Sequence, residues 1–349
     1  LNPEITETDA VEMLAQHIIT KPVFETLFSG NDFSKENAVS KAIEKVLNEV
    51  YKTNIEKENN SLKNFYSSVR RRAKDILTPK SKTVLLNELY ERFFKNAFPL
   101  TTQKLGIVYT PVEVVDFMIN SINDLLVENF DKKLEDKNIH ILDPFTGTGT
   151  FVTRLLQSGL ISSKNISNKY LNEIHANEVV LLAYYVAGIN IESVYQTIKK
   201  ENKYKPFDGI VLTDTFQLYE QERDMFDELM PDNSQKRKNQ KKRDITVVMG
   251  NPPYSVGQTA ANDNAQNIKY LNLDEKIKTT YAKHTKATNK GSLYDSYIRA
   301  FRWASDRIKH EGIVAFVTNA NWIEANAIDG MRKSINEEFS KIIIINLRG

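Results

Sequence analysis

The chain has 349 residues, of which 41% are hydrophobic and 26% charged, which are the proportions of a soluble globular protein with room for two domains. Its net charge of +2 excludes a polycation, so a nucleic-acid surface would have to be a local patch. The absence of cysteine excludes disulfides, thiolate metal sites and cysteine nucleophiles, and it favours a cytoplasmic protein. No apolar run approaches the ~20 residues of a membrane span.

The first third of the chain is predicted to be helical. Apolar residues follow helical spacing around 38–50, 62–76 and 84–94, and nothing there has catalytic spacing. We therefore predict an all-α packing or coupling domain at 1–99. The chain starts at Leu1 and stops just after an apolar run at 341–347, so we expect it to be part of a longer protein.

A helix start is predicted at Tyr109-Thr110-Pro111. Thr110 is a good N-cap, Pro111 suits the first helical position, and Glu113 would complete a capping box. These residues could also contact a ligand.

The most informative stretch follows an apolar run at 139–142, which predicts a buried strand. It leads into the sequence Asp143-Pro144-Phe145-Thr146-Gly147-Thr148-Gly149, and the next apolar residues have helical spacing. A strand, an acidic turn, a glycine loop and a helix form a nucleotide-binding corner, because glycine lets the backbone approach a ligand closely. A dinucleotide motif would have a third glycine where Val152 stands, so an ordinary glycine turn is the alternative.

Two further acids stand at predicted strand ends. The second strand, predicted at 169–178, ends at Glu178, which is placed to accept ribose hydroxyls, although a solvent-exposed glutamate is the alternative. The third, at 209–212, leads into Asp214-Thr215-Phe216, where the carboxylate could accept an adenine amine and the ring could pack on the base. A polar loop predicted at 217–244 holds six cations between 235 and 243, which either contact DNA phosphates or are simply solvated.

The fourth predicted strand, at 245–249, leads into the second anchor of the site, Asn251-Pro252-Pro253-Tyr254. Two successive prolines fix φ and remove two N–H donors, so this loop is rigid and has free carbonyl groups. An amide precedes them and an aromatic ring follows, which would be unusual in a plain turn.

The remaining segments complete an alternation of strands and helices. We predict a loop or lid at 255–291, helices at 292–308 and 324–335, and strands at 312–317 and 341–347. This order predicts an α/β fold with a doubly wound, mostly parallel, Rossmann-like sheet. Ligands of such sheets bind at the carboxyl ends of the strands, which is where the predicted site residues fall: Asp143, Glu178, Asp214 and Asn251.

The predicted site favours a nucleoside without a polyphosphate. Acids at the second and third strand ends suit a ribose and an adenine amine, and the glycine loop lacks the lysine of a P-loop. S-adenosylmethionine fits this description. The Asn251 side-chain oxygen and the Pro252 carbonyl could accept the hydrogens of a planar amine and localise its lone pair for methyl transfer, with Tyr254 stacked on the base. A base in duplex DNA would have to be flipped out of the stack.

These motifs, in this order, resemble those of γ-group DNA adenine-N6 methyltransferases. The segments 172–178 and 346–349 also resemble the methyltransferase part of Type ISP single-chain restriction-modification enzymes. In that family a nuclease and a helicase-like motor precede a helical coupler, and target recognition follows the methyltransferase. The resemblance implies a coupler at 1–99, a methyltransferase at 100–349 without its recognition domain, and double-stranded DNA as the partner.

The resemblance also implies the roles of individual residues. The cofactor's ribose would lie on Glu178 and its adenine on Asp214, with Thr215 and Phe216 beside it. The target base would lie in the loop of Asn251, Pro252, Pro253 and Tyr254. The methionine end of the cofactor would lie on the remaining residues of the site, namely Tyr109, Thr110, Pro111, Asp143, Pro144, Phe145, Gly147, Thr148 and Gly149.

Two other functions remain open. The loop at 251–254 would suit any planar amine, so a protein glutamine or an RNA base is a second candidate acceptor, although the large helical region argues against it. A non-catalytic coupling or DNA-binding module is another, against which the intact loop argues. The five histidines show no ligand spacing, so we expect no metal.

Overall fold

The computed structural model describes residues 7–27, 36–52, 63–74, 79–90, 110–200, 204–220, 229–254, 269–288 and 290–347. Tyr109, which we predicted to contact a cofactor, lies outside these residues. None of the described helices is both long enough and apolar enough to cross a membrane.

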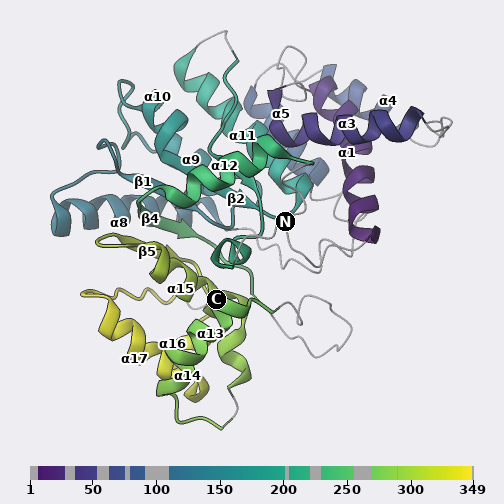
Figure 1. Ribbon diagram of the computed structural model, residues 1–349. Helices are drawn as coiled ribbons and strands as arrows, with labels where there is room; N and C mark the ends of the chain where they lie inside the picture. Colours follow the sequence, from purple (N-terminus) through teal and green to yellow (C-terminus); the bar gives the residue numbers. More distant parts are fainter. Residues whose placement is uncertain are drawn as a thin grey trace.

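A parallel sheet forms the centre of the described chain (Figure 1), with the strand order β3-β2-β1-β4-β5. Its strands are β1 (His140–Asp143), β2 (Ile174–Glu178), β3 (Ile210–Leu212), β4 (Ile245–Gly250) and β5 (Ile313–Phe316). This confirms the predicted doubly wound sheet. The order reverses at the β1–β4 pair, and such a reversal opens a crevice for ligands at the carboxyl ends of the two strands.

Helices cover both faces of the sheet. They are α1 (Glu7–Leu27), α3 (Ala38–Lys52), α4 (Lys63–Lys74), α5 (Pro79–Leu89), α8 (Val112–Phe130), α9 (Thr150–Gln157), α10 (Ile166–Asn168), α11 (Leu181–Lys199), α12 (Pro231–Lys242), α13 (Leu271–Thr279), α14 (Tyr281–His284), α15 (Ser296–Arg307), α16 (Asn321–Glu324) and α17 (Asp329–Glu338). Short turns of helix stand at η2 (Lys169–Glu173), η3 (Phe216–Tyr219), η5 (Gly291–Tyr294) and η6 (Asn326–Ile328).

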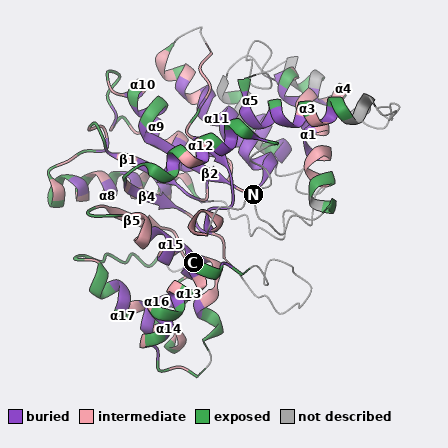
Figure 2. Ribbon diagram, in the orientation of Figure 1, coloured by how far each residue is buried: buried purple, intermediate pink, exposed green. Residues whose placement is uncertain are grey.

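Successive strand residues face opposite layers of the core. Ile141 and Val247 pack with α8, α9 and α11, whereas Leu142 and Val248 pack with α15 on the other face. Both faces of β1 and β4 are therefore buried, as Figure 2 shows in purple. This burial explains why these strands read as continuous apolar runs.

Helices α1 and α5 pack on α11, whereas α4 packs on α1 and α3 packs on α1 and α12. The buried residues of these helices belong to the same core as the sheet. His17 Nδ1 lies 2.8 Å from the hydroxyl of Tyr185, and Asn37 donates to the hydroxyl of Tyr184 at 3.1 Å. The all-α character predicted for this region is confirmed for its described residues, while the boundary at 99 and 100 stays a prediction.

The predicted sixth strand is wrong. Residues 341–347 form no strand, and Ile343, Ile345 and Leu347 are 55%, 54% and 64% exposed. An apolar run becomes a strand only when a neighbouring strand supplies hydrogen bonds, and within the described residues β5 pairs only with β4.

Three other segments also differ from prediction. Residues 169–173 form the turn η2 rather than the start of the second strand. The predicted loop at 255–291 contains α13 and α14, and its part at 255–268 lies outside the described residues. The predicted basic loop is the helix α12, because Pro231 begins it and the buried side chains of Asn233 and Arg237 anchor it.

Candidate active site

The loops that follow β1, β2, β3 and β4 lie together at the carboxyl edge of the sheet. The hydroxyl of Thr215, after β3, donates to the carbonyl of Pro144, after β1, at 2.6 Å. A Cβ on Gly250, at the end of β4, would lie 2.9 Å from Asp143 Oδ1. The structure therefore joins the acidic turn after β1, the loop after β3 and the loop that begins at Asn251.

Asp143 ends β1 and is fully buried. Its Oδ1 accepts the backbone N–H of Phe145 at 3.1 Å, whereas Oδ2 has no hydrogen-bond partner among the described residues. Burial raises the pKa of this carboxyl to about 8, and the nearby Glu178 carboxyl adds to the rise. A buried carboxylate oxygen without a donor is costly, so the geometry fits a ligand that brings an N–H or cationic group to Oδ2.

The glycine loop needs its two glycines for different reasons. Gly147 (φ +56°) and Gly149 (φ +90°) both have left-handed backbone conformations. A Cβ on Gly149 would lie 3.2 Å from the Cα of Ala187 in α11, while one on Gly147 would meet nothing within 4 Å. Gly149 therefore permits close packing on α11. Gly147 leaves an open approach to the backbone, and the Thr148 carbonyl accepts from the side chain of Asn190 at 2.9 Å.

Glu178 ends β2, and its carboxylate faces the glycine loop and the start of α11. Oε2 accepts the N–H of Gly147 at 2.8 Å, and Oε1 accepts those of Val179 and Val180 at 2.9 and 2.8 Å. Burial raises the pKa of the carboxyl to about 7, against these three donors. A carboxylate accepts about four hydrogen bonds, so about one acceptor position remains for a ligand.

Asp214 and Phe216 follow β3 and are nearly buried. Asp214 Oδ1 accepts the N–H of Phe216 at 2.9 Å, and Oδ2 accepts the hydroxyl of Tyr270 at 2.8 Å. The rings of Phe145 and Phe216 lie 5.5 Å apart, so they form one aromatic surface across the loops after β1 and β3.

The loop of Asn251, Pro252, Pro253 and Tyr254 follows β4. Asn251 Nδ2 donates to the hydroxyl of Thr110 at 2.9 Å. The hydroxyl of Tyr254 lies within hydrogen-bonding distance of two acceptors, Asn251 Oδ1 and the Val317 carbonyl. Pro252 is buried, whereas the other three residues are half-buried.

The predicted capping box is wrong in its details. Pro111, not Thr110, is the N-cap of α8, and no side chain caps the helix. The Thr110 hydroxyl accepts from Asn251 instead, which joins the start of α8 to the Asn251 loop. Pro111 contributes its carbonyl, which accepts the N–H groups of Val114 and Val115.

Three residues of this site were missed by sequence reasoning. Asn177 is fully buried in β2, and its amide N–H donates to Thr215 at 3.2 Å while its Oδ1 has no partner among the described residues. Tyr270 contacts Asp214, and Val317 contacts Tyr254 through its carbonyl. Asn177 directly precedes the predicted site residue Glu178, and this adjacency could have identified it from the sequence. Tertiary packing places Tyr270 and Val317 at the site, and no local sequence pattern predicts their positions there.

Two cations of the basic run at 235–243, Lys236 and Arg243, lie away from this edge. Lys236, Asn239 and Arg243 line a hollow of about 530 Å³ together with Ile174 and Gly209, which stand at the amino ends of β2 and β3. Lys236 also forms an ion pair with Asp208 at 2.7 Å. Within the described residues, no group of three or more acids or histidines could hold a metal ion.

The reversed parallel sheet, with an acidic turn and glycine loop after β1 and the Asn251 loop after β4, defines a Rossmann-like methyltransferase fold. The family model of the N-6 DNA methylases matches residues 81–292, and that of the Type ISP restriction-modification enzyme coupler domain matches residues 1–81. The chain belongs to the N-6 DNA methylase family and carries a Type ISP coupler domain before it. Members of this family use a methyl-donor cofactor.

Solved structures show the same relationship. The chain is 47% identical, with a TM-score of 0.89, to the ATP-dependent Type ISP restriction-modification enzyme LlaBIII bound to DNA, over 96% of this chain and 23% of that one. It is 45% identical (TM-score 0.90) to a nuclease-deletion mutant of the Type ISP enzyme LlaGI in complex with a DNA substrate mimic, over 97% and 28% of the two chains. For a DrdV–DNA complex the values are 37% identity, a TM-score of 0.87, and 97% and 33% coverage. The chain thus spans between about a quarter and a third of these relatives' length, and no curated protein matches it.

Proposed function

We propose that the chain transfers a methyl group from S-adenosylmethionine to the exocyclic N6 of an adenine flipped out of duplex DNA, as the modification part of a restriction-modification system. One observation carries this proposal: Asp143 Oδ2, which is buried and has no partner among the described residues, lies beside the Asn251 loop where the sheet order reverses. Such a site would bring a cationic ligand and a planar amine together. The relatives' DNA-bound structures support DNA as the substrate. We assign the reaction to the cytoplasm.

The described residues fit this cofactor. Asp143 and the backbone of the glycine loop would hold the amino-acid end, Glu178 the ribose, and Asp214 with Phe216 the adenine. The unpartnered oxygen of Asp143 suits the ammonium group, and the open side of Gly147 allows close approach. When bound, S-adenosylmethionine supplies an electrophilic methyl group on its sulfonium.

The chain's own contribution is to hold and polarise the target amine. Thr110 fixes the Asn251 amide, so that Oδ1 and the Pro252 carbonyl accept the two N6 hydrogens and localise the nitrogen lone pair. Tyr254 has a second acceptor in the Val317 carbonyl, 3.0 Å away, so its O–H can turn there and free Asn251 Oδ1 for the base. Held in this way by Asn251 and Pro252, N6 would be the nucleophile toward the methyl group that a bound cofactor would supply, and its extra proton would pass to water.

Titration calorimetry with S-adenosylmethionine, ATP and NAD tests the cofactor, and methyl transfer to duplex DNA, RNA and a glutamine peptide tests the acceptor. We expect selective binding of S-adenosylmethionine and N6-methyladenine in the DNA. Transfer to RNA or the peptide alone would replace DNA as the acceptor. Cofactor binding without transfer to any acceptor would support a non-catalytic coupling module.

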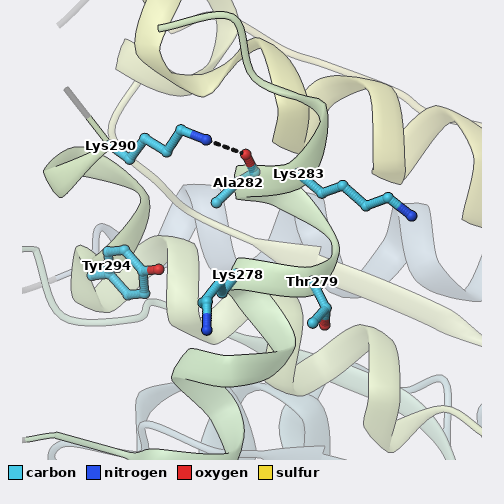
Figure 3. Close-up of a pocket in the computed structure, with 6 residues that line it drawn as sticks. All are labelled: Lys278, Thr279, Ala282, Lys283, Lys290 and Tyr294. Atoms are coloured by element: carbon cyan, nitrogen blue, oxygen red, sulfur yellow. Dashed lines mark hydrogen bonds between the residues drawn. The ribbon is translucent and has the colours of Figure 1, made fainter. Parts of the chain in front are cut away.

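A basic hollow on the small helices beyond the Asn251 loop is a candidate surface for the DNA backbone. It has a volume of about 620 Å³, and Lys278, Lys283, Lys290 and Tyr294 line it (Figure 3). Lys278 also pairs with Glu275 at 2.9 Å, and Lys290 donates to the Ala282 carbonyl at 2.7 Å. Tyr294 and Tyr254 pack against the same hydrophobic cluster, so one folded unit supports both the hollow and the catalytic loop. Ammonium groups beside an aromatic ring suit phosphates and a sugar.

Replacing these three lysines with glutamine should therefore lower the salt dependence of DNA binding by about two to three units of log–log slope, since each lost phosphate contact removes about 0.9. Fluorescence anisotropy of a labelled duplex between low and moderate salt measures it. The matched comparison is glutamine at three exposed cations of the other basic run, Lys241, Lys242 and Arg243. A fall of the slope only in that second variant would assign the phosphates to the run at 235–243 instead.

A further inference from the structure

Tyr270 lies against the carboxylate that the proposed function assigns to the cofactor's adenine. It directly precedes α13, and its side chain reaches back to the loop after β3, where its hydroxyl donates to Asp214 Oδ2 at 2.8 Å. Both side chains are nearly buried, at 6% and 8% exposure. The Tyr270 ring also meets the edge of Phe216, with ring centres 5.3 Å apart.

The position of Tyr270 is itself fixed by charged neighbours. The Arg299 guanidinium stacks 5.1 Å from the centre of the Tyr270 ring and forms a bidentate pair with Asp274 at 2.8 and 2.9 Å. Asp274 in turn accepts the N–H of Tyr270 at 3.2 Å and donates its own N–H to the Tyr270 carbonyl at 2.7 Å. The backbone, ring and hydroxyl of Tyr270 are therefore all held in place. A side chain that orients another group must itself be fixed by its neighbours in this way.

Three donors on Asp214 fix the plane of its carboxylate. Phe216 N–H fills one position on Oδ1, Tyr270 O–H fills one on Oδ2, and the backbone N–H of Gln217 also donates to the carboxylate. About one of the four acceptor positions therefore remains for a ligand. Burial raises the pKa of Asp214, and the hydrogen bond from Tyr270 opposes that rise. The hydroxyl thus favours the form of the carboxylate that accepts hydrogen bonds without donating one.

We infer that Tyr270 is a positioning residue of the cofactor site: its hydroxyl orients the Asp214 carboxylate to accept an N–H of the exocyclic amine of the cofactor's base. This inference rests on the proposed function, which places adenine on Asp214. Tyr270 follows the Asn251 loop in the chain, so the proposed cofactor site would not be formed by the loops after β1, β2 and β3 alone. Recognition of the exocyclic amine would then also depend on the start of α13.

The test compares two ligands that differ at the amine. S-adenosylhomocysteine donates an N–H at the base, whereas S-inosylhomocysteine has a carbonyl oxygen there and leaves Asp214 without its donor. The parent chain should prefer the adenosyl ligand by roughly 10- to 100-fold, the range of one charge-assisted hydrogen bond. Tyr270→Phe keeps the ring, its Phe216 contact and the Arg299 stack, and it should narrow this ratio by about ten-fold through weaker adenosyl binding.

Tyr219→Phe is the matched control, because it deletes another tyrosine–aspartate bond, from Tyr219 to Asp306 at 2.6 Å, and should leave the ratio unchanged. Asp214→Asn should abolish the preference, and adding Tyr270→Phe to it should change nothing further. Equal weakening of both ligands, or no change, would overturn the inference and leave the proposed function standing. If the parent chain binds neither ligand, the proposed function itself fails.

If Tyr270→Phe does not fold, 3-fluorotyrosine at position 270 of the parent chain provides the second measurement. Its fluorine resonance should shift with the adenosyl ligand and much less with the inosyl ligand. Equal shifts would contradict the inference.

Discussion

Replacing Asn251 with alanine is expected to lower methyl transfer by about 10³-fold while S-adenosylmethionine binds with nearly unchanged affinity, because a preorganised group aimed at the reacting centre contributes at about this level. The amide directly follows β4, where its N–H donates to Thr110 and its oxygen accepts from the hydroxyl of Tyr254. Alanine removes an acceptor for the target amine and leaves the loops of the proposed cofactor site intact. Single-turnover transfer of a labelled methyl group to DNA measures the loss, and calorimetry measures cofactor affinity.

Asn319→Ala is the matched control for this variant. Asn319 lies in the loop after β5, where its side chain accepts the N–H of Asn321 at 2.8 Å. Its loss should leave methyl transfer within a few-fold of the parent. Thr110→Val keeps Asn251 but removes the acceptor that holds its amide, so an intermediate loss is expected. Near-normal turnover of Asn251→Ala would show that the amide oxygen takes no part in the reaction.

Replacing Asp143 with alanine is expected to weaken S-adenosylmethionine binding by roughly 10- to 150-fold, the equivalent of about 1.5–3 kcal/mol for a charge-assisted hydrogen bond. Asp143 is fully buried, and its Oδ2 has no donor among the described residues, so a bound ammonium would satisfy it. Asp143→Asn distinguishes the effect of the charge from that of the side-chain shape, since it removes the charge but keeps an acceptor for the Phe145 N–H. Calorimetric titration of all three proteins measures the effect, and unchanged affinity in both variants would remove the residue from the cofactor site.

The pKa of Asp143 gives this variant a pH signature. Burial raises the folded pKa to about 8, whereas an unfolded aspartate ionises near 3.9. Between these values the folded chain holds a proton that the unfolded chain releases, so this group's contribution to the free energy of unfolding falls as pH rises through that window. Asp143→Asn should therefore gain stability over the parent between pH 5 and pH 8, as chemical denaturation at the two pH values would show.

The same shift predicts proton release on cofactor binding. At pH 7 the carboxyl of the free protein is mostly protonated, and a cationic ligand favours its ionised form. Binding to the parent should release close to one proton more than binding to Asp143→Asn. Calorimetry in buffers of different ionisation enthalpy measures this number, and equal release from both proteins would mean that Asp143 does not meet a cation.

Local signals predicted the sheet and most of the strand-end residues. The apolar runs before Asp143 and Asn251 are continuous because β1 and β4 are buried on both faces. The glycine loop could be recognised because glycine adopts the left-handed conformation of Gly147 and Gly149 without the steric cost that other residues bear. The same kind of reasoning failed at 341–347, since an apolar run does not reveal whether a neighbouring strand exists to pair with it. The prediction that Thr110 caps its helix also failed, because the Thr110 hydroxyl accepts a hydrogen bond from Asn251 instead of from the helix backbone.

By itself the sequence determined the class of fold, the likeness to adenine methyltransferases and the residues at the ends of four strands, because these depend on periodicity and on short motifs within one segment. Only the tertiary structure decided which hydrogen-bond partners those residues have. It occupied three acceptor positions of Glu178, left Asp143 Oδ2 without a donor in the described part of the chain, and brought Tyr270 to Asp214 across 56 positions of chain. Hydrogen bonds between distant segments depend on how whole loops pack, and no local pattern encodes them.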